Sequence, residues 1–465
     1  MSDREHLLES RPYAEIRVGD TASITRTVSQ MDIAAFAAVS GDVNPVHLDE
    51  QAAPGGIVAH GMLGGALVST VLGTRLPGPG TIYVAQDLRF RRPVRVGDTI
   101  TVTVEVREKA AGNRVVLDCR CTNGAGELVT DGRAEVVAPD KKLLVAVAEA
   151  PELMLQTHDS FGALMRANEG IPPIPCAVVH PCSVDALEGA IDAARAGVIA
   201  PILVGPRAKV LATAEQAKLD IAAYELVDVP HSHAAAERGV ALVREGKAAL
   251  LMKGSLHTDE LMAAVVAKET GLRTARRVSH VFVMDVPTYP KPLWITDAAI
   301  NIFPTLEDKA DIVQNAIDLF RGLGLGTPKV AILSAVETVN PKIPGTIDAA
   351  ALCKMADRGQ ISGAALDGPL ALDNAISRRS AEIKGIVSTV AGDADILLVP
   401  DLEAGNMLAK NLSFLANADA AGIVLGARVP IILTSRADSV RARLASAAVA
   451  ALYAHRRAQA APVAG

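Results

Sequence analysis

The chain has 465 residues, of which 50% are hydrophobic and 21% charged, and its formal net charge is −6. This length is too great for one hydrophobic core, so we expect two or three domains. The mildly acidic balance and the aromatic content of 3% argue against nucleic-acid binding. No apolar run reaches the roughly 18–20 residues needed to span a membrane. The N-terminus lacks the apolar core of a signal peptide and the five cysteines form no CxxC pair, which predicts a cytoplasmic protein with reduced thiols.

The first part of the chain, up to about residue 140, predicts one buried helix and a sheet. Residues 61–73 form an apolar helical pattern with little polar face. Four strand-like segments follow, separated by the turn signals VGD, AGN and NGAG, at residues 81–92, 98–108, 114–122 and 127–137. Many of their positions alternate between apolar and polar side chains, as in TVTVEV. A sheet wrapped around the apolar helix accounts for both patterns.

The second part, after the PDKK stretch at residues 139–142, alternates short apolar strands with helices. The strands are expected at residues 177–180, 201–205, 247–252, 330–334, 395–400 and 430–434. Helices are expected at 184–196 and from the N-cap Thr305, with Asp308 three residues on, to Gly322. This alternation predicts a parallel, doubly wound sheet.

The turn SGDVNPVHLD at residues 40–49 concentrates polar side chains after an apolar helical pattern. Asp42 and His47 lie five residues apart on either side of Pro45, and such a pair can bind a water and transfer its proton. The alternative is an ordinary helix-ending turn with a capping Asp. Further on, His60-Gly61 opens the apolar helix, where free N–H groups would stabilise an enolate oxygen, although a Gly there can also serve backbone geometry alone.

These residues resemble the MaoC-like, R-specific enoyl-CoA hydratase family over residues 17–137. The motifs are FAAVSGDVNPVHLD (36–49), GGIVAHGML (55–63) and YVAQDLRFRRPVRVGDTI (83–100). The resemblance implies a hot-dog fold and hydration of a trans-2-enoyl-CoA to a 3-hydroxyacyl-CoA. It implies that Asp42 and His47 activate the water, that Asn44 orients them and that the Gly61 amide is the oxyanion donor. Hot-dog folds also host thioesterases, but the intact Asp–His pair favours a hydratase.

In the second part, LMKGSLHTDEL at residues 251–261 runs from a strand through Lys253 and Ser255 into a helix that we expect Thr258 to cap. An ammonium, a hydroxyl and backbone N–H groups at the carboxyl end of a parallel strand suit an anion such as phosphate or the phosphates of CoA. The alternative is an ordinary strand-to-helix turn with an exposed Lys. The spacing of the histidines and cysteines is not typical of a metal site, and we expect no bound metal.

With this turn, three later segments resemble the phosphate acetyl/butyryltransferase family from about residue 152 to the end. They are SHVFVMDVP (279–287), VPDLEAGNMLAKNL (399–412) and PIILTSRADSV (430–440), and DGPLALDNAIS (367–377) points to the butyryl branch. The resemblance implies an α/β phosphotransacylase domain of two Rossmann-like subdomains with a cleft between them. It also implies acyl transfer between CoA and inorganic phosphate without a metal.

The same resemblance implies roles for individual residues. Ser435 and Asp438 would assist deprotonation of the CoA thiol, and Arg436 would hold the phosphate with its guanidinium fork. The expected phosphate- or CoA-binding residues are Lys253, Ser255, Thr258, Arg273 and Asn406. The chain departs from the family at residues 262–263, Met-Ala, where a helix Arg is common; Arg273 or Arg276 would then supply the charge.

The sequence therefore predicts a bifunctional acyl-CoA enzyme without a bound cofactor, whose substrates are CoA thioesters and inorganic phosphate. The expected organisation is an α+β hot-dog domain at residues 1–140, a linker at 141–151 and the α/β transferase domain at 152–465. We expect at least a homodimer. Two alternatives stay open: an acyl-CoA-binding or scaffolding protein with only one active half, and a phosphotransbutyrylase whose hot-dog module serves dimerisation alone.

Overall fold

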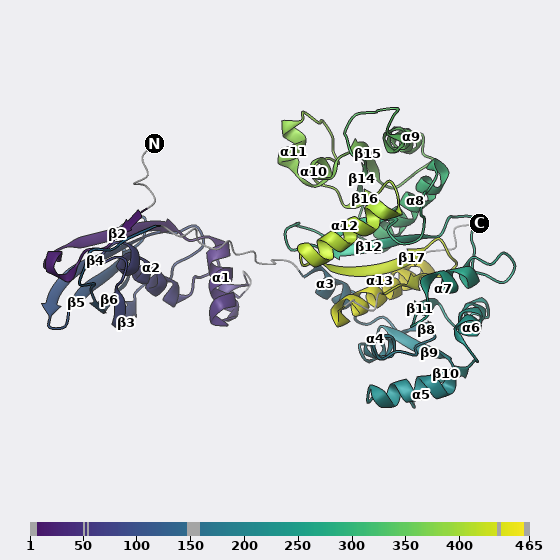
Figure 1. Ribbon diagram of the computed structural model, residues 1–465, viewed down its shortest axis with the longest axis horizontal. Coiled ribbons are helices and arrows are strands. Elements are labelled where there is room, and N and C mark those ends of the chain that lie inside the picture. The colour runs from purple at the N-terminus through teal and green to yellow at the C-terminus, as the bar shows by residue number, and fades with distance from the viewer. Residues whose placement is uncertain (1–6, 50–51, 54, 147–158, 435–438, 460–465) are drawn as a thin grey trace. The chain divides into compact units, whose positions relative to one another are not determined.

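The computed structural model describes residues 7–49, 52–53, 55–146, 159–434 and 439–459. The chain divides into two compact units, Met1–Leu155 and Gln156–Gly465 (Figure 1). Within the expected linker, β7 (Leu144–Ala146) pairs antiparallel with β1 (Leu7–Glu9) of the first unit. The domain boundaries at residues 140 and 152 stay a prediction.

The first unit is built on a five-stranded antiparallel sheet and one central helix. In spatial order its strands are β2 (Thr21–Thr27), β4 (Thr99–Ala110), β5 (Arg114–Thr122), β6 (Leu128–Val137) and β3 (Ile82–Phe90). The helix is α2 (Gly61–Thr74). The four expected strands and the expected helix are present within two residues of their predicted ends, whereas β2 was not predicted.

The sheet and α2 form the core of this unit because each presents an apolar face to the other. Leu67, Val68, Val71 and Leu72 of α2 are buried. Alternate residues of β4 are buried as well, including Val102, Val104 and Val106. This period of two is that of a strand with one face on a core. The predicted hot-dog fold, a sheet wrapped around a helix, is confirmed.

Two short elements carry the polar turn of the first unit. Helix α1 (Gln30–Ser40) begins at a capping box between Ser29 and Asp32. It ends at Gly41, which has a left-handed backbone with φ of 73° that glycine adopts without a steric cost. The 3₁₀ helix η2 (Pro45–His47) follows, with Asn44 as its N-cap. The chain thus places Asp42 in the short loop between α1 and η2, and His47 at the end of η2.

The second unit contains one sheet of eleven strands within the described residues. Their spatial order is β10 (Glu225–Asp228), β9 (Ile199–Gly205), β8 (Ile174–Val179), β11 (Leu250–Lys253), β18 (Ile431–Ile432), β17 (Asp419–Leu425), β12 (Ser279–Asp285), β13 (Leu293–Thr296), β16 (Ile396–Leu398), β14 (Lys329–Leu333) and β15 (Ala365–Leu370). The strands from β10 to β18 are parallel to one another, as are those from β13 to β15.

The expectation of an entirely parallel sheet is wrong at the centre, where β17 and β12 lie. β17 is antiparallel to β18 and to β12, and β12 is antiparallel to β13. Three antiparallel pairings in succession reverse the direction, so the two parallel groups run in opposite directions. Each group is one α/β subdomain, and the carboxyl ends of the first group lie beside the start of β17.

Helices cover both faces of this sheet (Figure 1). They are α3 (Ser160–Arg166), α4 (Val184–Arg195), α5 (Arg207–Gln216), α6 (Ser232–Arg244), α7 (Thr258–Val265), α8 (Leu306–Gly322), α9 (Pro344–Asp357), α10 (Leu372–Ile376), α11 (Arg378–Ile383), α12 (Leu402–Leu415) and α13 (Val440–Gln459). The predicted capping box at Thr305 and Asp308 is confirmed. The expected cap at Thr258 is wrong, because His257 is the N-cap and Thr258 the first helical residue. None of the described helices is long and apolar enough to cross a membrane.

Candidate active sites

Asp42 and His47 lie close together in the loop that follows α1. His47 Nε2 is 4.0 Å from Asp42 Oδ2, and the side chains are 12% and 54% exposed, respectively. The other ring nitrogen, Nδ1, lies 2.6 Å from the carbonyl oxygen of Val58. Since a carbonyl only accepts, this contact assigns the proton of the neutral ring to Nδ1 and leaves a lone pair on Nε2. These two acceptors lie 4.0 Å apart, so a single water between them can donate one hydrogen bond to each.

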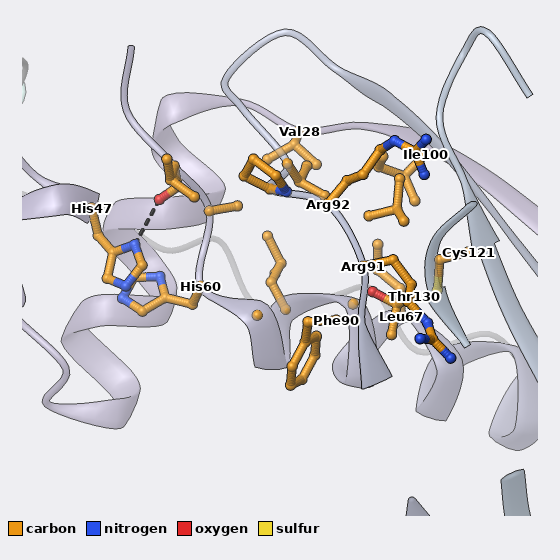
Figure 2. A pocket seen from close by; sticks show the side chains of 18 residues that line it. Val28, His47, His60, Leu67, Phe90, Arg91, Arg92, Ile100, Cys121 and Thr130 are labelled. Atoms are coloured by element: carbon orange, nitrogen blue, oxygen red, sulfur yellow. Dashed lines mark hydrogen bonds between the residues drawn. The ribbon is translucent and has the colours of Figure 1, made fainter. Parts of the chain in front are cut away.

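His60 belongs to the same cluster, although the sequence predicted only that it precedes the start of the helix. It is the N-cap of α2 and is 3% exposed. Its Nε2 lies 2.9 Å from the backbone oxygen of Asp42, and its ring stacks on that of His47 at 3.8 Å between centroids (Figure 2). The one feature of the sequence that could have indicated this role is that His60 directly precedes Gly61, the proposed oxyanion donor.

Asn44 shapes the loop and does not hydrogen-bond to the side chain of His47 among the described contacts. Its side-chain oxygen accepts from the backbone N–H of Val46 at 3.4 Å, which caps η2. Its own backbone N–H donates to Asp42 Oδ1 at 3.3 Å. Asn44 can therefore orient the carboxylate through the main chain, and its side chain fixes the turn that carries His47.

A cavity of about 380 Å³ adjoins this cluster. Gly61 lines it and begins α2, whose first backbone N–H groups have no acceptor within the helix. A Cβ added at Gly61 would lie 3.3 Å from the ring of Phe90, so the glycine permits a close approach to its backbone. Most other lining side chains are apolar, among them Leu63, Leu67, Ile100, Val129 and Val28. An apolar cavity with a few polar groups at one end suits an acyl chain with a thioester. In Figure 2, His47 and His60 lie at one end, away from Cys121 and Thr130.

Asp42, His47 and His60 also offer ligand atoms that lie within 4.8 Å of one another. A tetrahedral zinc site needs ligand atoms about 2.0–2.2 Å from one centre. The two imidazole planes differ by 28° and stack face to face, so their in-plane lone pairs do not converge on one point. One nitrogen of each ring is also engaged with a backbone carbonyl. The arrangement fits proton transfer better than metal binding.

In the second unit, a cavity of about 620 Å³ brings together three of the predicted binding residues. Lys253 ends β11, Thr258 begins α7 and Asn406 lies on α12. Asn406 Nδ2 donates to the backbone oxygen of Ala298 at 3.2 Å. Lys410, one turn further along α12, also lines the cavity. Two lysines therefore line a cavity at the carboxyl ends of the first strand group, where open sheets bind ligands.

Ser255 and Arg273 are not among the described residues that line this cavity. Ser255 Oγ donates to the backbone oxygen of His180 at 2.9 Å and lies 3.1 Å from its Nδ1. Arg273 is exposed and forms an isolated backbone bridge with Ala427. Arg276, the other cation considered, pairs with Asp318 at 2.6 Å. Ser255, Arg273 and Arg276 therefore have these contacts and are not among the described residues that line the cavity with Lys253 and Asn406.

Ser435, Arg436 and Asp438 lie outside the described residues. Thr434 and Ser439, on either side of that segment, both line the cavity with Lys253. Ala263, where the sequence departs from the family, lines a different cavity together with Glu260 of α7 and residues of α6.

Comparison with known proteins identifies both parts of the chain. The family model for phosphate acetyl/butaryl transferase matches residues 231–451, and the MaoC like domain matches residues 17–122. A phosphate acetyltransferase of Rhizobium meliloti is 67% identical over 297 residues, which are 64% of this chain and 94% of that protein.

Two solved structures are similar to parts of this chain. A branched-chain phosphotransacylase from Enterococcus faecalis V583 is 30% identical, with a TM-score of 0.54 over 61% of this chain and 99% of that one. The R-hydratase PhaJ1 from Pseudomonas aeruginosa is 49% identical, with a TM-score of 0.31 over 32% of this chain and 99% of that one. From the matches over its C-terminal part, the chain belongs to the phosphate acetyl/butyryltransferase family, and it carries a MaoC-like domain before the transferase region.

Proposed function

We propose that this protein is a bifunctional acyl-CoA enzyme. The first unit hydrates a trans-2-enoyl-CoA to a 3-hydroxyacyl-CoA, and the second transfers an acyl group between CoA and inorganic phosphate. The observation that carries the first activity is the gap of 4.0 Å between Asp42 Oδ2 and His47 Nε2 beside the cavity that Gly61 lines. Membership of the transferase family carries the second.

In the hydration step, one water would donate one hydrogen bond to Asp42 and one to His47. As the water oxygen attacks the β-carbon of the enoyl thioester, one of these groups takes the proton and the carbonyl becomes an enolate. The backbone N–H of Gly61 would stabilise the enolate oxygen at the start of α2. Return of a proton to the α-carbon completes the addition of water. The neutral imidazole of His47, with its proton on Nδ1, is in the form that accepts a proton.

In the transfer step, a phosphate oxygen would attack the thioester carbonyl, the carbon–sulfur bond would break, and the thiolate of CoA would take up a proton. The resemblance implies that Ser435 and Asp438 exchange that proton with the CoA sulfur and that Arg436 holds the phosphate. Lys253 and Thr258 are proposed to hold phosphate or the phosphates of CoA, with Asn406 beside them, because all three line one cavity. Ser255 and Arg273 are proposed from the family resemblance alone, since neither is among the described residues that line this cavity. Neither step is proposed to need a metal.

The relative that is 67% identical is named a phosphate acetyltransferase, which makes acetyl-CoA the first thioester to test. Residues 367–377 favour butyryl-CoA as the second. The test is release of thiol from each thioester with and without phosphate, and loss of the enoyl absorbance of crotonyl-CoA, on one preparation. Hydration without phosphate-dependent release would favour the alternative of a protein with only one active half.

We further propose a homodimer or higher homo-oligomer in the cytoplasm. β3 is the last strand in the order of its sheet, and among the described residues it pairs with β6 alone. It exposes Ile82 at 64% and Phe90 at 52%, with Tyr83 and Val84 also exposed. An edge strand with exposed apolar side chains is ready to pair with another chain. The free cysteines fit a reducing compartment, where CoA thioesters are used.

A further inference from the structure

His60 contacts both members of the proposed catalytic pair. Its Nε2 donates to the backbone oxygen of Asp42 at 2.9 Å, and its ring stacks on His47 at 3.8 Å with 28° between the planes. We propose that His60 is a positioning residue, which sets the separation between the Asp42 carboxylate and the His47 imidazole. This inference rests on the proposed hydratase activity and assigns His60 no contact with the reacting atoms.

The hydrogen bond from His60 matters because Asp42 has little else to hold it. Its side chain is 54% exposed, and it follows Gly41 in a loop. Its other hydrogen bonds among the described residues, with Ser40 and Asn44, lie within the same turn and move with it. The bond from His60 joins residues 18 positions apart and ties the loop to the start of α2. It therefore fixes where the carboxylate lies relative to the oxyanion donor.

The stack from His60 restrains the second member of the pair. His60 lies in contact with Phe36, at 5.0 Å between ring centroids, and with His47. Its ring defines the plane of the His47 ring, and the bond to Val58 fixes the rotation of that ring. Together these contacts direct the Nε2 lone pair of His47 toward Asp42. The 4.0 Å gap that one water can span is thus set by His60 from both sides.

The burial of His60 indicates that this position requires an imidazole and not just any aromatic ring. The ring is 3% exposed, and its Nδ1 is buried without a hydrogen-bond partner among the described residues. A buried polar nitrogen without a partner destabilises the fold. A phenyl ring would stack on His47 without that penalty, so packing alone does not explain a histidine here. The hydrogen bond from Nε2–H to the backbone oxygen of Asp42 explains why this residue is a histidine.

Two substitutions separate the functions of the ring. His60→Phe keeps an aromatic ring and removes the donor, and we expect it to lower kcat for crotonyl-CoA hydration by about 10- to 100-fold, the scale of a misplaced catalytic group. His60→Gln keeps an N–H donor near the position of Nε2 and should recover part of that loss. Phe36→Leu alters packing on His60 without removing either contact and should leave kcat within about 3-fold of the parent.

A double-mutant cycle distinguishes positioning from general damage. In the Asp42→Asn background, His60→Phe should lower kcat far less than it does in the parent, because the carboxylate that His60 positions is already absent. An equal loss in both backgrounds, or full hydration by His60→Phe, overturns the inference. If His60→Phe does not fold, His60→Met, which also lacks the donor, takes its place. A parent that does not hydrate crotonyl-CoA refutes the proposed function instead, and acyl transfer on each preparation checks that the chain is intact.

Discussion

Asp42→Asn removes the negative charge from one of the two acceptors that face each other across 4.0 Å, with little change of shape. The amide oxygen still accepts a hydrogen bond, but it does not take a proton from water. If the amide turns the other way, its NH₂ group points at the water position. Loss of a general base costs about 10²–10⁴-fold in rate. We therefore expect hydration to fall at least about 10²-fold, or about 3 kcal/mol of transition-state stabilisation.

The measurement is kcat and kcat/KM for crotonyl-CoA, followed by loss of the enoyl absorbance. The Asp42 side chain is 54% exposed, so the substitution should change the free energy of unfolding by no more than about 0.5 kcal/mol. Acyl transfer on the same preparation should equal that of the parent. His47→Gln should give a loss of the same order. Hydration at the parent rate by both variants would refute the role of this pair.

Three other perturbations test Arg436, the buried His280 and the exposed edge of β3. Arg436→Gln should lower phosphate-dependent release of CoA by at least about 10²-fold, and Arg436→Lys should stay well below the parent because it loses the planar fork. The measurement is thiol release, with unchanged hydration of crotonyl-CoA as the control. A fully active Arg436→Gln variant would contradict the role of Arg436. Burial lowers the pKa of His280 to about 3, so below about pH 6.5 the unfolded chain binds a proton that the folded chain does not. The free energy of unfolding should therefore fall as the pH drops, by about 2 kcal/mol at about pH 5. In urea unfolding at about pH 7 and pH 5, His280→Leu should lose this part of the pH-dependent fall in the free energy of unfolding. If the variant and the parent lose the same free energy between the two pH values, His280 is not its source. Val84→Lys should weaken self-association if β3 forms the interface, and light scattering that gives the same mass for variant and parent would exclude this edge.

The sequence was most informative where one strand or helix carries its own signal. β5 has the predicted bounds because alternation and turn residues mark both of its ends. In contrast, β13, with four residues, was not predicted, and neither was the antiparallel direction of β12 and β17. A run of four buried residues such as Leu293–Thr296 does not distinguish a strand from a helix, and the direction of a strand depends on which neighbours it finds in the folded sheet.

The site shows the same division between local and tertiary information. Asp42 and His47 were predicted as a pair because one short turn carries both, and their side chains lie 4.0 Å apart. His60 was not assigned a role because its contacts with Asp42 and His47 arise only when α2 packs beside the loop. Ser255 was predicted to bind the substrate from its place beside Lys253, and this stays a prediction; the sequence did not predict that its hydroxyl donates to the backbone oxygen of His180. Neighbours in the sequence at a strand end point in different directions, and the pattern of residue types does not reveal which of them faces the ligand.

The central claim is that one chain carries two acyl-CoA activities in separate units. The most direct test incubates a single preparation with crotonyl-CoA, and in parallel with acetyl-CoA or butyryl-CoA plus phosphate. We expect hydration in the first reaction and phosphate-dependent release of thiol in the second. We also expect that Asp42→Asn abolishes only the first and Arg436→Gln only the second. A parent protein that lacks either activity with all of these substrates, or a substitution that abolishes both, would contradict the claim.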